Sequence, residues 1–107
     1  MYKDVNNYYI MDFQELKYEG QTYTEYNQII KILKSEGFYW LIDSETDGAI
    51  LEIENGTIIW HQGIYMVGDW KYGIFKNGGF YGNWENGIWE DGYFNGNWKS
   101  GINLSKN

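Results

Sequence analysis

The 107-residue sequence contains no cysteine, no proline and no arginine, and it has a single histidine. Without cysteine, the chain forms no disulfides, no zinc-thiolate sites and no cysteine nucleophile. No stretch approaches the roughly 18 consecutive apolar residues of a membrane-spanning helix. The N-terminal MYKDVNNYY also lacks the apolar segment of a signal peptide. We therefore expect a soluble cytoplasmic protein with no membrane contact.

Acidic residues outnumber lysines, and the excess lies in the first half of the chain. The formal net charge is −7. Residues 1–54 contain eleven acidic residues and four lysines, whereas residues 55–107 contain four of each. Nucleic-acid affinity depends on cationic side chains that release counterions from phosphates, so direct binding of DNA or RNA is disfavoured. The acidity favours instead a protein partner with a basic surface.

The first half has the pattern of a small α+β unit with one helix. Residues 8–13 and 16–18 are typical of strands, and Glu19-Gly20 predicts a turn. Thr24 is the expected N-cap of the helix, and Gly37 suits the left-handed position after its end. The residues at helical spacing that predict its apolar stripe are Tyr26, Ile29, Ile30 and Leu33.

Two further strand segments follow the helix. FYWLI at 38–42 is rich in aromatic and aliphatic side chains and predicts a buried strand. AILEIENGTIIW at 49–60 alternates with period two around an Asn-Gly pair, the strongest short signal for a hairpin. We expect Ile53 to pair with Ile58, and Leu51 with Trp60.

The second half is a repeat with a period of 14 residues. GDWKYGIFKNGGFY at 68–81 aligns with GNWENGIWEDGYFN at 82–95, and GNWKSGI at 96–102 begins a third copy. Each copy divides into units of five, five and four residues, most of which place a small or polar residue before glycine. WHQGIYMVG at 60–68 follows the same rhythm more loosely.

The repeat is compatible with two backbone paths, and the sequence leaves both open. In an antiparallel meander, Asn86-Gly87 and Asp91-Gly92 form type I′ turns. That path pairs Glu85 with Ile88, Trp84 with Trp89, and Trp89 with Phe94, and the cross-strand ring pairs hold the short strands together.

The alternative path is a β-solenoid in which successive copies stack as coils. Gly68, Gly82 and Gly96 would then lie at corners, and Trp70, Trp84 and Trp98 would stack in register. The predicted fold class is thus α+β: an acidic head at residues 1–59, an all-β array of Gly-aromatic repeats at 60–102, and a polar tail at 103–107. The head is the expected N-terminal cap of the array.

The Phe80-Tyr81-Gly82-Asn83-Trp84 stretch, with FNGNW and GDW, resembles the core of MORN repeats, whose signature is a tyrosine, a glycine and an aromatic residue in a short hairpin. The resemblance covers residues 60–102, with a period shorter than that family's. The array is more similar to degenerate Gly-Trp repeats of phage-encoded proteins. Such families imply scaffolding and protein contact rather than catalysis. Choline-binding repeats are also similar, but their Trp-Tyr-Tyr run is missing here.

Few residues suggest catalysis or metal binding. His61 is the one histidine, and no serine lies in a nucleophile motif. DSETDGAILEIE at 43–54 matches several positions of an EF-hand calcium loop, but strand-like flanks favour an acidic turn between two strands. Glu52 and Glu54 alternate onto one strand face, which glycosidase chemistry would also use, yet a solvated face explains them better. We predict no enzyme activity, cofactor or metal site.

The sequence therefore predicts a non-enzymatic protein-binding module. Most concretely, its composition and resemblance suggest an inhibitor that binds the basic nucleic-acid channel of a host defence nuclease, as anti-CRISPR proteins do. The alternative is a structural or surface-recognition module, such as a virion component or a glycan or choline binder with aromatic platforms. The predicted partner-binding residues are Asp43, Glu45, Asp47, Glu52, Glu54, Trp70, Trp84, Trp89 and Trp98.

Overall fold

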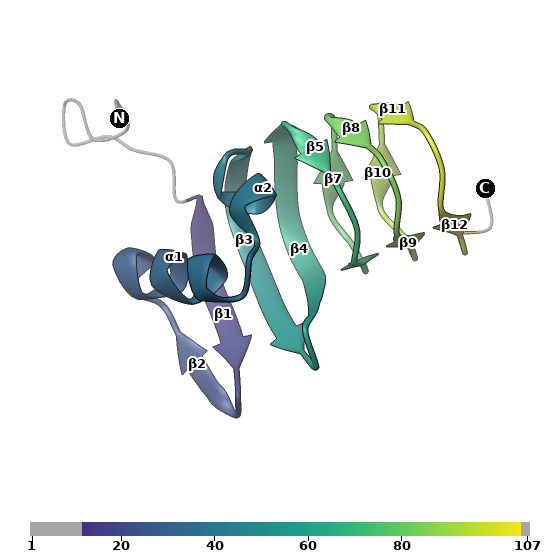
Figure 1. The fold of residues 1–107 in the computed structure, drawn as a ribbon. Helices are drawn as coiled ribbons and strands as arrows, with labels where there is room; N and C mark the ends of the chain where they lie inside the picture. Colours follow the sequence, from purple (N-terminus) through teal and green to yellow (C-terminus); the bar gives the residue numbers. More distant parts are fainter. Residues whose placement is uncertain (1–11, 106–107) are drawn as a thin grey trace, which may run out of the picture.

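The computed structural model describes residues 12–105, which form an α+β head followed by a short β-solenoid (Figure 1). The head comprises β1 (Phe13–Tyr18), β2 (Gln21–Tyr23), α1 (Tyr26–Ser35), α2 (Tyr39–Ile42), β3 (Glu45–Glu54) and the first part of β4 (Thr57–Val67). Eight two-residue strands follow: β5 (Asp69–Trp70), β6 (Ile74–Phe75), β7 (Gly79–Phe80), β8 (Asn83–Trp84), β9 (Ile88–Trp89), β10 (Tyr93–Phe94), β11 (Asn97–Trp98) and β12 (Ile102–Asn103). Neither helix in this part of the chain is long and apolar enough to cross a membrane.

The head is a sheet covered on one face by the helices. β1 and β2 form a hairpin whose turn has positive φ at Glu19 (49°) and Gly20 (81°), which confirms the predicted turn. The predicted strand at 8–13 lies mostly outside the described residues, and β1 begins at its last residue. β3 pairs in parallel with β1 and antiparallel with β4. Parallel strands need a crossover connection, and α1 and α2 supply it.

Helix α1 forms where the apolar stripe predicts it, with a different cap. Glu25, not Thr24, is the N-cap, because the Glu25 carboxylate accepts a hydrogen bond from the backbone N–H of Gln28 at 2.9 Å. Gly37 has φ of 85° just after the helix, as predicted for a left-handed C-terminal position.

Residues 38–42 form a helical turn, so the predicted strand there is wrong. Phe38 and Leu41 are buried, whereas Tyr39 is 57% exposed. A strand would place Phe38 and Leu41 on opposite faces. In a helical turn, residues three apart lie on the same face, so both side chains reach the core. Because β1 and β4 occupy both edges of β3, the segment packs over the sheet.

The β3–β4 hairpin is confirmed with its predicted register. Asn55 (φ 52°) and Gly56 (φ 78°) both have positive φ, as a type I′ turn requires. Ile53 pairs with Ile58, and Leu51 pairs with Trp60. β4 then continues across residue 60, so the head and the array share a strand and one hydrophobic cluster.

The array is a solenoid with three sides, not a meander. Every short strand pairs in parallel with the strand one coil away, as β6 does with β9 and β8 does with β11. One side contains β4, β6, β9 and β12, the second contains the end of β4 with β7 and β10, and the third contains β5, β8 and β11. The units of five, five and four residues are the three sides of one coil.

Aromatic rings from successive coils stack in three columns inside the solenoid. The columns are Trp60, Phe75 and Trp89; Tyr65, Phe80 and Phe94; and Trp70, Trp84 and Trp98. Successive ring centroids lie 4.5 to 5.4 Å apart, at interplanar angles of 4° to 12°. Rings of different columns meet edge to face, so two favourable ring geometries fill the core.

Glycine occupies the corners because neighbouring coils approach too closely for a side chain. Gly73, Gly87 and Gly101 form one corner column, with φ between 120° and 128°. A Cβ on Gly87 would lie 2.6 Å from the carbonyl oxygen of Gly73. The predicted corner glycines Gly68 and Gly82 meet in the same way. The predicted type I′ turns of the meander are not formed, because φ is positive at Gly87 and Gly92 but not at Asn86 or Asp91 before them.

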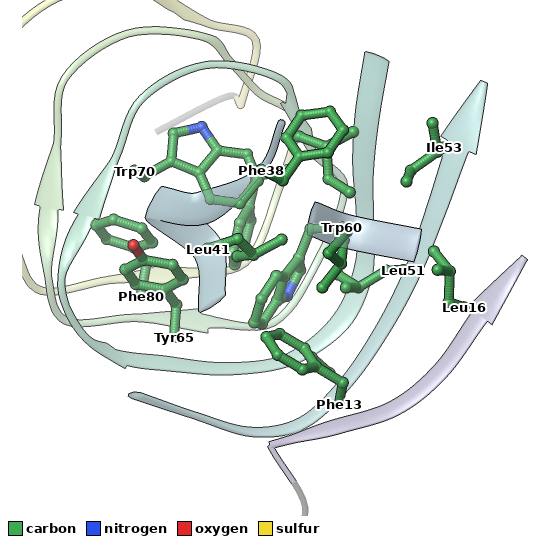
Figure 2. Packing of buried hydrophobic residues seen from close by; sticks show 14 of the residues in the cluster. Phe13, Leu16, Phe38, Leu41, Leu51, Ile53, Trp60, Tyr65, Trp70 and Phe80 are labelled. Carbon is green, nitrogen blue, oxygen red and sulfur yellow. The ribbon is translucent and has the colours of Figure 1, made fainter. Parts of the chain in front are cut away.

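The head closes the N-terminal end of the solenoid. Trp40 of α2 packs its ring against Trp70 at 5.2 Å and 73°, an edge-to-face contact on the first ring of the third column. The Ser44 hydroxyl is hydrogen-bonded to the Tyr65 hydroxyl at 2.5 Å. Figure 2 shows Tyr65, Trp70 and Phe80 inside the coil and Leu41 of α2 in the same buried cluster.

Alkaline pH is expected to destabilise the fold through two tyrosines. Burial raises the pKa of Tyr65 above its usual value of 10, and the hydrogen bond to Glu36 raises the pKa of Tyr18 to about 12. Both contributions are complete below pH 10 and are lost as the pH rises toward the folded pKa values, because only the unfolded chain releases the protons there. Above pH 10, ionisation of Tyr65 in the unfolded chain is expected to lower the free energy of unfolding by about 1.4 kcal/mol per pH unit.

Urea unfolding at pH 8, 10 and 11 measures this effect. The free energy of unfolding is expected to fall less steeply with rising pH in Tyr65→Phe than in the wild type. Tyr93→Phe, which changes an exposed ring, is the matched control. Equal slopes for wild type and Tyr65→Phe would contradict the assignment.

Candidate interaction surface

The predicted acidic residues lie along β3 and just before it, and we call Asp43, Glu45, Asp47, Glu52 and Glu54 the acidic row. Asp43, Glu45, Asp47 and Glu54 are exposed, and Glu52 is half-buried. Between them, Thr46, Ala49, Leu51 and Ile53 are buried.

A bulge in β3 places the acidic side chains of the strand on one face. Strict alternation would put Glu45 and Asp47 on the face opposite to Glu52 and Glu54. The pairing with β4 shifts register after Asp47, where Gly48 has φ of 67°. The extra residue reverses the alternation, so all four carboxylates point away from the core.

Few cations accompany the acidic row. Glu52 Oε1 lies 2.8 Å from Nε2 of His61 on β4, and Lys17 of β1 pairs in register with Glu52. Among residues 12–105, no ion pair involves Asp43, Glu45, Asp47 or Glu54. The outward face of β3 is therefore a concentrated negative surface.

The solenoid neutralises its own charges, in contrast. Lys76 lies 3.6 Å from Glu90, and Lys99 lies 3.6 Å from Glu85. Each pair joins positions one 14-residue period apart. Opposite charges therefore lie next to each other in successive coils and neutralise each other. The electrostatic field of the molecule consequently originates in the head.

A hollow of about 460 Å³ lies at the end of the head where the β1–β2 turn (Glu19-Gly20) and the β3–β4 turn (Asn55-Gly56) lie. Its acidic lining residues are Glu19, Glu36, Glu52 and Glu54, and among residues 12–105 its one lining cation is Lys17. The Tyr18 hydroxyl donates a hydrogen bond to Glu36 at 2.5 Å there. The hollow therefore joins two members of the acidic row to two carboxylates from other elements.

Three of the four predicted contact tryptophans point into the solenoid. Trp70 and Trp84 are fully buried and Trp89 is 3% exposed, so in this fold their rings contact other coils rather than a partner. Trp98, in the last coil, is 38% exposed and is the one that presents a ring to solvent. Burial follows from position in the stack, because an inner ring is covered only where coils lie on both sides of it.

Exposed tyrosines on the second side of the solenoid were missed by the sequence analysis. Tyr81 and Tyr93 are 47% and 60% exposed, with ring centroids 5.9 Å apart. Ile64 and Val67 are exposed on the same side. The available signal was their place next to the inner ring of each unit, which alternation directs outward.

The acidic segment does not adopt the geometry of a calcium loop. Residues 45–54 form strand β3, so neither an EF-hand loop nor the predicted acidic turn is present. Within residues 12–105, no group of three or more histidine, aspartate or glutamate side chains is placed to hold a metal ion. The predicted absence of catalysis remains a prediction.

The chain matches no protein-family model, and it finds no match among curated proteins or among solved structures.

Proposed function

We propose that the protein is a non-enzymatic inhibitor that docks its acidic row on a basic nucleic-acid-binding surface of a host defence nuclease, in the manner of anti-CRISPR proteins. The observation that carries this proposal is the exposed acidic face of β3, which has few cations beside it. A phage-encoded protein of this kind would act in the cytoplasm of the host bacterium.

The dimensions of the acidic row suit a limited basic patch. From Glu45 to Glu54 the strand extends about 30 Å, and it carries four carboxylates. Duplex DNA presents about one charge per 1.7 Å of axis, so it would carry several times more charge over that length. We infer that the row engages one part of a nucleic-acid channel while the rest of the molecule blocks access to it.

The acidic hollow offers a place for a partner's arginine or lysine. It combines four carboxylates, those of Glu19, Glu36, Glu52 and Glu54, with the cation Lys17, and its volume of about 460 Å³ accommodates a long cationic side chain. An arginine can bond two carboxylate oxygens at once, which gives direction as well as attraction.

Charge reversal separates this proposal from a non-specific effect of net charge. Glu45→Lys/Asp47→Lys is expected to lower affinity for the nuclease at least tenfold, because it places like charges together at the interface. The matched control is Glu85→Lys/Glu90→Lys, which changes the net charge equally in the solenoid. The measurement is inhibition of DNA cleavage by a panel of RNA-guided nucleases over a range of salt concentrations.

Wild-type inhibition is also expected to weaken as salt rises, since exposed charge pairs are screened. Equal loss in the two double variants, or inhibition independent of salt, would contradict docking through the acidic row. Affinity capture from host lysate with mass spectrometry identifies the partner, and recovery of capsid or cell-wall material would instead support a structural or surface-recognition role.

A further inference from the structure

The third side of the solenoid, formed by β5, β8 and β11, repeats the same contacts from coil to coil. Trp70, Trp84 and Trp98 stack with successive centroids 5.2 Å apart and planes 6° and 8° from parallel. Each coil thus presents a flat ring to the next one.

Side chains beside the rings form a further ladder and an ion pair. The Asn83 side-chain amide donates to Asp69, and that of Asn97 donates to Asn83, both at 2.9 Å. On the other side of the ring, Lys99 lies 3.6 Å from Glu85. The last coil therefore contacts the coil before it through an amide, a ring and a charge at the three successive residues Asn97, Trp98 and Lys99.

Backbone hydrogen bonds follow the same period. The N–H groups of Asn97 and Lys99 donate to the carbonyl oxygens of Gly82 and Trp84, at 3.0 and 2.8 Å. The equivalent carbonyl groups one coil later belong to Gly96 and Trp98. Within residues 12–105 no coil follows β11 on this side, so these two acceptors receive no such bond.

The last coil consequently presents an incomplete ladder at the end of the molecule farthest from the head (Figure 1). Trp98 is 38% exposed and borders two hollows, of about 350 and 230 Å³. In the described part of the chain, Asn97 Oδ1 accepts no bond from a later side chain, and Lys99 pairs with a single carboxylate.

We propose that β11 is a docking edge for an extended strand of a partner protein, which adds as a further coil side. The strand that fits carries asparagine, an aromatic residue and an acidic residue in succession. Its amide donates to Asn97, its ring stacks on Trp98, and its carboxylate pairs with Lys99. Strand addition of this kind draws affinity from the main chain and specificity from alternate side chains.

Charge and size favour this occupant over a second copy or a glycan. The column beside the rings alternates Lys71, Glu85 and Lys99, so an acid is the complementary next member. One side of a coil has five residues and is about 16 Å long. The surface at the open end of the solenoid, including its side chains, is therefore on the order of a few hundred Å². A stable dimer needs about 800 Å² from each partner. A sugar would use the ring but neither the lysine nor the open carbonyl groups.

The proposal does not rest on the proposed inhibitor function, because β11 belongs to the last coil of the solenoid, whereas the acidic row lies on and just before β3 in the head (Figure 1). Its test uses the full-length protein and a blocked peptide with the sequence GNWENGI, which is that of residues 82–88. Amide chemical shifts in the isotope-labelled protein are followed as the peptide is added up to millimolar concentrations.

The expected result is a saturable set of shifts centred on residues 96–100. Trp98→Ala in the protein, or alanine for tryptophan in the peptide, is expected to weaken binding at least tenfold. Lys99→Glu changes a mostly exposed side chain, so it keeps the fold, and it is expected to weaken binding twofold to fivefold. A peptide with lysine in place of glutamate should recover that loss, and the spectra themselves report whether each variant is folded.

Three outcomes would overturn the proposal. The first is the absence of shifts at millimolar peptide, or shifts that Trp98→Ala leaves unchanged. The second is a concentration-dependent dimer in sedimentation that Trp98→Ala abolishes, which would make a second copy the occupant. The third is a soluble oligosaccharide that shifts the same amides while the peptide does not, which would assign the end to a glycan.

Discussion

Replacing Trp84 with alanine is expected to lower the free energy of unfolding by about 3 to 5 kcal/mol, the usual range for removing a buried tryptophan. Trp84 is fully buried at the centre of the third ring column, stacked between Trp70 and Trp98. It also meets Phe80 edge to face at 5.5 Å. Its removal leaves a cavity that the neighbouring coils cannot close, because each is held in place by two other columns.

Urea unfolding followed by circular dichroism measures the loss, and amide hydrogen exchange locates it. Because each coil contacts only its neighbours, we expect protection to fall first in residues 82–105 and to persist in the head. Trp98→Ala is the matched control. Its ring is already 38% exposed and stacks on one side only, so less than half the effect is expected. Equal losses in the two variants would contradict a stack that depends on coil position.

The second large effect is expected from Gly87→Ala, with a loss of about 3 kcal/mol or more from combined backbone strain and steric overlap. Gly87 has φ of 128°, and an added Cβ would lie 2.6 Å from the carbonyl oxygen of Gly73. Neither atom can move freely, because the Cβ is fixed to the Gly87 backbone and the Gly73 carbonyl oxygen already accepts a hydrogen bond from the N–H of Ile88 at 2.8 Å. The alanine variant must therefore separate two coils at this corner.

Two other glycines separate the causes of that loss. Gly79 lies in the same array and does not have positive φ, and a Cβ added there would be 3.5 Å from the nearest atom, in the ring of Tyr81. The free energy of unfolding of Gly79→Ala is therefore expected to stay within about 0.5 kcal/mol of the wild type. Gly56→Ala has φ of 78° but open space around it, and the expected loss is about 1 kcal/mol from strain alone. Urea midpoints of the three variants test the order. A loss for Gly79→Ala as large as that for Gly87→Ala would show that close approach of coils does not determine the glycine positions.

Local signals predicted those parts of the fold that depend on neighbouring residues. Asn55-Gly56 adopts the two positive φ values of a type I′ turn, so the hairpin and its register follow from the turn. Gly37 follows the helix end for a similar reason. For the solenoid path, which the sequence left open beside the meander, the 14-residue period also predicted that Trp70, Trp84 and Trp98 would stack, because identical coils place identical positions in line.

Other features depended on contacts that a local pattern does not contain. FYWLI has the composition of a strand, yet it forms α2 because both edges of β3 are taken and Phe38 and Leu41 must reach the same core. The bulge after Asp47 could not be derived from alternation, although it brings the carboxylates onto one face. Sequence reasoning identified the acidic residues as a group, and the bulge decided that they share a surface.

By itself, the sequence determined a repeating array with an acidic unit before it, because period and charge are properties of residue order. Tertiary structure decided the path of that array. An Asn-Gly pair permits either a type I′ turn or a solenoid corner, and the choice lies in the approach of Gly73 to Gly87 and in ring stacking between residues 14 positions apart. The same long-range contacts decided that Trp84 is core and Trp98 is surface, since chemically identical rings differ only in whether another coil covers them.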